Sequence, residues 1–187
     1  MALHAISADD RASQAQNGRG GRMSLHSDLL FQAKQLVVKE PTRPKQASLR
    51  RAVSAAYYAI FHLLIFESSK SLVTGDGLRK LVGRAFAHGD MKNASKPFAS
   101  GSLPARLQVV IAPPVPAQIQ VVAKAFIALQ QARHEADYNT AKSFSKSEAQ
   151  ALVDQADQAF DDWKAVRKTD YAKLYLVSLF VGKRWER

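Results

Sequence analysis

The sequence predicts an all-α fold, an up-and-down bundle of about five helices, from three observations. There is no proline between Pro44 and Pro97, and after Pro116 there is neither proline nor glycine before Gly182. Long stretches that lack helix breakers and are rich in Ala, Gln, Lys and Leu favour helices. Within these stretches apolar residues recur every three or four positions, which is the spacing of one helix face.

Proline places the first helices. Pro41 and Pro44 separate a first helix, over about 25–39, from a longer second one. The second helix has one apolar face, formed by Leu49, Val53, Ala56, Tyr57, Ile60, Phe61 and Leu64. The stretch 100–116 contains four prolines and is predicted to be a loop, in which 107–111 is the one piece that could form a short strand.

The later helices follow from apolar spacing and a capping signal. A stripe through Val122, Phe126 and Leu129 marks one helix. Ser145 with Glu148 three residues on is a capping box, which predicts the start of the next helix. A last apolar segment covers 171–181.

The first 22 residues differ in composition from the rest. They are polar and rich in Gly and Gln, with no periodicity, so they are predicted to form a disordered tail. Met23 follows directly, which favours an upstream mis-start over a genuine short arm. Residues 23–187 are predicted to form a single helical domain.

The charge balance points to an anionic partner. The 187 residues include 27 Lys and Arg against 16 Asp and Glu, a net charge of +11 with a pI near 10.0. Nucleic acid, an acidic protein and an anionic membrane surface are all compatible with it, as is a basic protein with no such partner. Residues 41–96 and 163–187 carry most of the excess, so they form a basic surface if the fold brings them together.

Several classes of chemistry are excluded or disfavoured. The chain has no Cys, which removes disulfides, cysteine nucleophiles and thiolate metal sites and fits a reducing, cytoplasmic location. It has no phosphate-binding glycine loop, no Gly-x-Ser-x-Gly elbow and no metal-type spacing of its five His, so no metal or cofactor is expected. The longest apolar run, 55–66, is too short to span a membrane, and no secretory signal precedes it.

A charged pair interrupts an apolar stripe. Continuing the Val122–Phe126–Leu129 stripe leads to Arg133 and then to Asp137, where an apolar residue is expected. The two are four residues apart and can pair on that face. One interpretation is a buried strut that ties helices together. The other is a site for a phosphate or for a residue of a partner subunit, which would suit a homodimer.

Basic and aromatic residues form further clusters. Tyr58 and His62 lie four residues apart on the second helix, after two arginines, and Arg84 and His88 have the same spacing on what reads as a solvated helix face. Core aromatics and solvated charges explain them without any function. The positive charge of this segment favours a nucleic-acid or nucleotide-binding set instead, consisting of Arg50, Arg51, Tyr58, His62, Arg84 and His88.

Two segments resemble a known family. Residues 49–62 read Leu-Arg-Arg-Ala-Val-Ser-Ala-Ala-Tyr-Tyr-Ala-Ile-Phe-His, and a later helix contains Arg133-x-x-Ala136-Asp137-Tyr138. In this order they resemble the small bacterial branch of the HEPN (higher eukaryotes and prokaryotes nucleotide-binding) superfamily. The resemblance covers roughly residues 24–168.

The resemblance implies an all-α bundle of four or five helices that usually dimerises. Many HEPN proteins are metal-independent RNases, often toxins paired with a minimal nucleotidyltransferase antitoxin, with an Arg and a His from each subunit at the active site. Arg133 matches that arginine, whereas the positions expected to hold the histidine are Tyr138, Asn139 and Thr140. The candidate catalytic residues are Arg133, Asp137 and Tyr138.

Three functions follow. The first is a HEPN-like domain that binds nucleotide or RNA, in a toxin–antitoxin or defence-type system. The second is a non-catalytic subunit that partners a minimal nucleotidyltransferase. The third is an unconventional metal-independent RNase toxin in which Tyr138 or His134 replaces the missing histidine.

Overall fold

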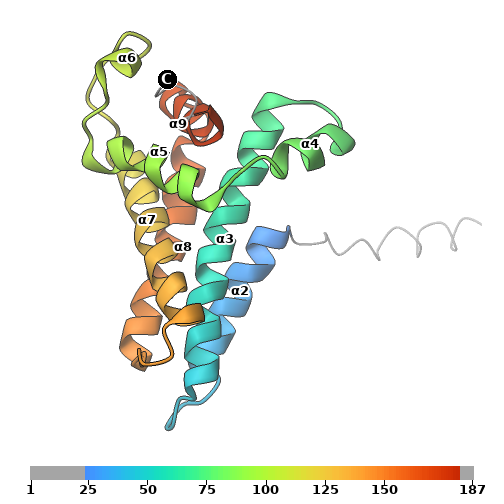
Figure 1. The fold of residues 1–187 in the computed structure, drawn as a ribbon, viewed down its shortest axis with the longest axis vertical. Helices are drawn as coiled ribbons and strands as arrows, with labels where there is room; N and C mark the ends of the chain where they lie inside the picture. The colour runs from blue at the N-terminus through green and yellow to red at the C-terminus, as the bar shows by residue number, and fades with distance from the viewer. Residues whose placement is uncertain (1–23, 182–187) are drawn as a thin grey trace, which may run out of the picture.

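The computed structural model describes residues 24–181, which form an all-α bundle without strands (Figure 1). This confirms the predicted fold class. Eight helices lie in this range, more than the five or so predicted: α2 (Leu25–Val38), α3 (Gln46–Leu72), α4 (Asp76–Gly83), α5 (His88–Ser100), α6 (Ala105–Gln108), α7 (Ala117–Tyr138), α8 (Lys146–Val166) and α9 (Asp170–Val181). The predicted tail, 1–22, lies outside the described residues.

Helix α3 is the central element of the bundle. It contacts α2, α7, α8 and α9, and the long helices run side by side around it (Figure 1). Its predicted apolar face is buried, with Tyr57, Ile60 and Leu64 fully inaccessible to solvent. Burial of such side chains is the main stabilising contribution in a bundle of this kind.

The same helix is long and apolar enough to cross a membrane, judged by length and composition alone. Of its apolar window, 72% is buried inside the bundle, as expected for the core helix of a folded domain.

The chain between α3 and α5 departs from the sequence prediction. Helix α3 ends at Leu72, and Gly75 then adopts a φ of +88°, a conformation that L side chains rarely take. The short α4 follows, and a second break separates Arg84 from His88. The prediction that these two residues share one helix face is therefore wrong, because the absence of proline does not exclude a break at glycine.

The proline-rich stretch 100–116 is mostly irregular, as predicted. It includes the single turn of α6, and no strand forms at 107–111. This stretch and α6 project from one end of the bundle, beside α9 (Figure 1).

The predicted capping box at the start of α8 is confirmed. The Ser145 Oγ accepts a hydrogen bond from the Glu148 backbone N–H at 3.1 Å, and the Glu148 carboxylate accepts one from the Ser145 N–H at 2.7 Å. These bonds, together with Lys142, lower the pKa of Glu148 to about 2. The carboxylate is thus ionised at neutral pH and fixes the point where α8 begins.

Candidate functional site

The predicted ion pair between Arg133 and Asp137 is confirmed and lies where α7 meets α3. The Arg133 Nε and the Asp137 Oδ2 are 2.7 Å apart, and the two side chains are only 19% and 24% exposed. Two residues of α3 hold the pair. The Ser54 hydroxyl donates to Asp137 Oδ1 at 2.5 Å, and Arg133 Nη2 donates to the Tyr58 hydroxyl at 2.7 Å.

These contacts use part of the Arg133 guanidinium. Burial lowers the pKa of Arg133, but Tyr58, Asp137 and Tyr138 outweigh burial and raise it, so the side chain stays a cation. Its Nε forms the ion pair with Asp137 without hydrogen-bond geometry, and its Nη2 donates to the Tyr58 hydroxyl, whereas Nη1 makes no hydrogen bond to residues 24–181. A guanidinium carries five N–H donors in a fixed plane, so donors on Nη1 are left for an external anion.

Two tyrosine rings flank the guanidinium. The Arg133 Cζ lies 5.4 Å from the centre of the Tyr58 ring and 5.3 Å from that of Tyr138, within the range of cation–π contacts. Tyr138 is 64% exposed, so its ring offers an open aromatic face beside the cation.

Two histidines complete the cluster. The His62 ring stacks on Tyr58 at 6.2 Å, and His88 lies against Tyr58 at the same distance and against Phe61 at 4.1 Å. The His88 Nδ1 is 2.5 Å from the Tyr57 hydroxyl. Burial lowers the pKa of both imidazoles, and Arg133 and then His62 lower that of His88 further. Both rings are therefore neutral at pH 7.

The adjacent residues Arg50 and Arg51 lie in different environments. Arg50 Nη1 donates to the Ala136 carbonyl at 2.7 Å, and its Nη2 donates to the carbonyls of Asn139, at 2.8 Å, and Lys142. These carbonyls belong to the C-terminal end of α7 and the loop that follows, where helix carbonyls lack partners along the helix. Arg50 is thus a cap for α7, and little of its donor capacity remains.

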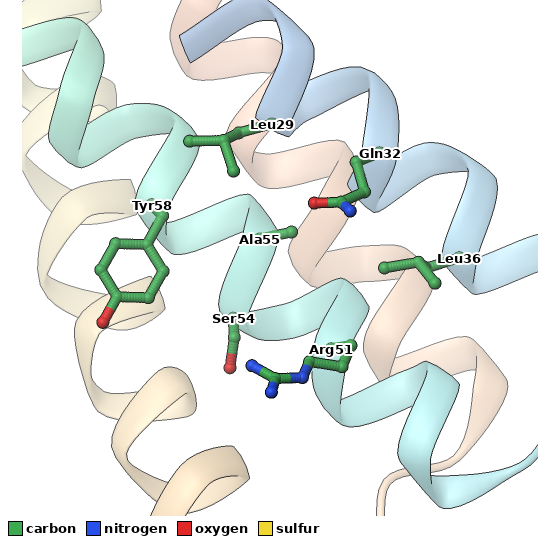
Figure 2. A pocket seen from close by; sticks show the side chains of 7 residues that line it. All are labelled: Leu29, Gln32, Leu36, Arg51, Ser54, Ala55 and Tyr58. Carbon is green, nitrogen blue, oxygen red and sulfur yellow. The ribbon is translucent and has the colours of Figure 1, made fainter. Parts of the chain in front are cut away.

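Arg51 is exposed and lines two hollows beside the ion pair. One, of about 390 Å³, includes Asp137. The other, of about 340 Å³, lies between α2 and α3, and its residues are drawn in Figure 2: Leu29, Gln32, Leu36, Arg51, Ser54, Ala55 and Tyr58. The Arg51 guanidinium lies next to the Ser54 hydroxyl (Figure 2) and forms no ion pair within the described part of the chain.

The remaining predicted residues lie at the edge of this cluster or beyond it. Arg84 is exposed at the end of α4 and lines a separate cavity, which it shares with His62. His134 is exposed, and its one ring contact in residues 24–181 is with Tyr138 at 5.0 Å. No group of three His, Asp or Glu that could hold a metal ion occurs in the same range.

Sequence reasoning missed three members of the site: Ser54, Tyr57 and Phe61. A signal existed for Ser54, which lies four residues before Tyr58 on the same helix. No local signal could have paired Tyr57 with His88, because that contact depends on the turns on either side of α4.

The chain matches no known protein-family model, no curated protein and no solved structure. The fold and the site define a helical bundle with a half-buried, tyrosine-flanked arginine next to two neutral histidines. The HEPN resemblance rests on the two sequence segments, and the function must be inferred from this geometry.

The two neighbouring arginines provide a first test. We expect Arg50→Ala to lower the free energy of unfolding by about 2 kcal/mol, because several carbonyls at the end of α7 lose a charged donor. The melting temperature should fall by roughly 4–8 °C. Arg51→Ala is the matched control and should melt within about 1–2 °C of the wild type, since exposed substitutions change little. Equal melting temperatures for the two variants would contradict the capping role.

Proposed function

We propose that the chain is a HEPN-like helical domain that binds RNA or a nucleotide through the phosphate, acting as a homodimer in a toxin–antitoxin or defence-type system. The proposal rests on one observation: Asp137 and Tyr58 hold the Arg133 guanidinium in place, while its Nη1 donors make no hydrogen bond within residues 24–181. A planar fork of this kind suits the oxygens of a phosphate.

The neighbouring groups fit the same ligand. Arg51 supplies a second cation from α3 at the hollow that contains Asp137. The exposed Tyr138 ring offers a surface on which a base can stack, next to the cation that takes the phosphate. The net charge of +11 favours the approach of a polyanion.

The alternative interpretation, in which Arg133 and Asp137 only tie two helices together, explains fewer of these observations. It accounts for the contacts that Arg133 makes through Nε and Nη2, which tie α7 to α3. It gives no reason for the free donors on Nη1 or for an exposed tyrosine ring stacked over the cation. A phosphate at this position makes use of both.

Salt-dependent RNA binding tests the proposal. We expect Arg133→Lys to weaken binding of a labelled single-stranded RNA by roughly tenfold, because Lys keeps the charge but lacks the planar fork. Arg133→Ala should weaken binding at least as much and lower the slope of log affinity against log salt by about one. Fluorescence anisotropy over a salt series measures both effects.

Lys124→Ala, at an exposed position of the same helix, is the matched control for charge. Melting curves for each variant show that the bundle is intact. Identical affinities for the wild type and both Arg133 variants would contradict the proposed site. A wild-type protein that binds no RNA at low salt would instead favour the alternative of a non-catalytic nucleotidyltransferase partner.

The histidines make the binding depend on pH. In the free protein burial holds the pKa of His62 below its usual value of 6.5, and burial together with Arg133 and His62 does the same for His88. A bound phosphate raises both pKa values, so binding takes up protons. Affinity for RNA should therefore rise, roughly threefold to tenfold, as the pH falls from about 7.5 to 5.5.

The stability of the free protein should change in the opposite direction. Histidines with a lowered pKa stabilise the fold above pH 6.5, and that contribution is lost as the pH falls through their pKa values in the folded protein.

The double variant His62→Gln/His88→Gln should have an RNA affinity that varies little between about pH 7.5 and 5.5, whereas His134→Gln should behave as the wild type. An unchanged pH profile in the double variant would rule out both imidazoles as the titrating groups.

A second candidate function is metal-independent RNA cleavage, which the two neutral imidazoles beside Arg133 favour. A neutral His62 or His88 can accept the proton of a ribose 2′-hydroxyl as that oxygen attacks the phosphorus, and Arg133 can stabilise the charge that develops on the phosphate. The P–O5′ bond then breaks to leave a 2′,3′-cyclic phosphate, and the departing 5′-oxygen takes up a proton from water. His134 is less suited to this role, because it contacts Tyr138 and not Arg133.

Cleavage is tested by incubating labelled RNA with the protein in excess chelator and separating the products on a gel. A ribonuclease of this kind should cut RNA in the wild type and in Lys124→Ala, and lose at least about a hundredfold in rate in Arg133→Ala and in His88→Gln. Intact RNA after incubation with the wild type would exclude this second candidate while leaving the binding proposal in place.

A further inference from the structure

The cavity that Arg84 and His62 line is larger than the two hollows beside the ion pair. It measures about 680 Å³ and is bounded by the start of α2, the C-terminal half of α3 and the short α4. Helix α4 leans away from the bundle at this end of α3 (Figure 1). A cavity of this size is in the range of sites for small organic ligands.

One wall of the cavity offers an accessible aromatic ring. Phe66 is 43% exposed, whereas Phe61 and Phe86, which also line the cavity, are buried. The His26 ring lies 5.2 Å from that of Phe66, and the Lys70 ammonium lies 5.9 Å from the ring centre. An exposed phenyl ring between a histidine and a lysine can stack a flat, electron-rich group.

The rim of the cavity is positively charged. Arg79 pairs with Asp76 at 3.3 Å. Lys80 and Arg84 also line the cavity, are exposed, and form no ion pair with any residue between 24 and 181. The two unpaired cations are suited to an anion at the mouth of the cavity.

A buried hydroxyl in the cavity wall lacks a partner. Ser69 is 4% exposed, lines the cavity, and its Oγ makes no hydrogen bond within the described residues. It lies beside Gly83, where an added Cβ would come within 3.9 Å of that oxygen. A buried polar atom without a partner is uncommon, and a polar ligand edge seated against this wall could satisfy it.

The cavity is connected to the Arg133 site along α3. Tyr58, His62 and Phe66 are spaced four residues apart, so they follow one helix face. His62 lines the cavity and stacks on Tyr58, whose hydroxyl accepts a hydrogen bond from Arg133. From Tyr58 to Phe66 the helix rises about 12 Å. A ligand that uses both sites must therefore extend along α3.

We propose that this cavity receives a base of a single-stranded RNA whose phosphates contact Arg133 at one end and Lys80 and Arg84 at the other. This inference rests on the proposed function and specifies its substrate. The Phe66 ring stacks the base, the Ser69 hydroxyl meets a polar edge of the base, and the rim cations take a phosphate. A duplex is not a substrate, because its bases are already stacked and paired.

The experiment compares three labelled probes of equal length by fluorescence anisotropy: a single-stranded RNA, the same strand in a duplex, and an abasic ribose-phosphate strand. The wild type should bind the single strand about tenfold more tightly than either of the other two, since stacking of a base on an aromatic ring makes a contribution of this order. Phe66→Ala should remove that preference and leave the affinity for the abasic strand unchanged. Phe66→Leu, which keeps the apolar volume without the ring, should do the same.

Phe31→Ala is the matched control, because Phe31 is a 56% exposed aromatic on α2 that lies outside the cavity. It should bind all three probes as the wild type does. Arg84→Gln should weaken the single strand and the abasic strand alike, and Lys124→Gln should weaken neither.

The outcomes separate this inference from the proposed function. Equal binding of the single-stranded and abasic probes by the wild type, with Arg133-dependent affinity for both, overturns the base pocket and leaves the phosphate site standing. Tighter binding of the duplex overturns the base pocket as well. Failure of the wild type to bind any probe overturns both proposals.

Discussion

The site depends on the contact that joins α7 to α3 through Arg133, Asp137, Ser54 and Tyr58. A half-buried guanidinium is costly unless its charge and its donors are matched. Here Asp137 balances the charge, Ser54 fixes the carboxylate, and Tyr58 takes one end of the fork. The ion pair at Nε and the hydrogen bond from Nη2 orient the guanidinium plane, so the unused donors on Nη1 point in a defined direction.

Arg50 and Arg51 show how one step along a helix changes what a side chain contacts. Successive residues on a helix point about 100° apart. Arg50 therefore reaches the end of α7, where it satisfies carbonyls, and it also lines the hollow beside Asp137. Arg51 lines that hollow too, and in addition the hollow between α2 and α3. Two adjacent arginines of the same type can thus have unrelated roles, and a sequence motif containing both does not distinguish them.

The sequence predicted contacts within one helix and missed those that cross a turn. The pairs Arg133–Asp137, Tyr58–His62 and Ser145–Glu148 were predictable, because helix geometry alone brings residues three or four apart together. The contact of His88 with Tyr57 was not, because it requires α3 to end at Leu72 and α5 to begin at His88. Gly75 has a positive φ at the first of these breaks, and a glycine there leaves no periodic signal in the sequence.

The neutral histidines determine what kind of site this is. Because burial lowers the pKa of His62 and His88, the cations where α7 meets α3 at neutral pH are guanidiniums: Arg133 in the ion pair, and Arg50 and Arg51 at the hollow beside Asp137. The positive charge of the site is thus carried by arginines. The imidazoles contribute flat, polarisable surfaces that continue the aromatic face of α3 towards Phe66. Under the proposed function, the ligand that matches this arrangement offers both phosphates and bases at intervals along its length. Simple anions match the arginines alone, and so, in the proposed function, it is the aromatic face rather than the net charge that makes binding selective.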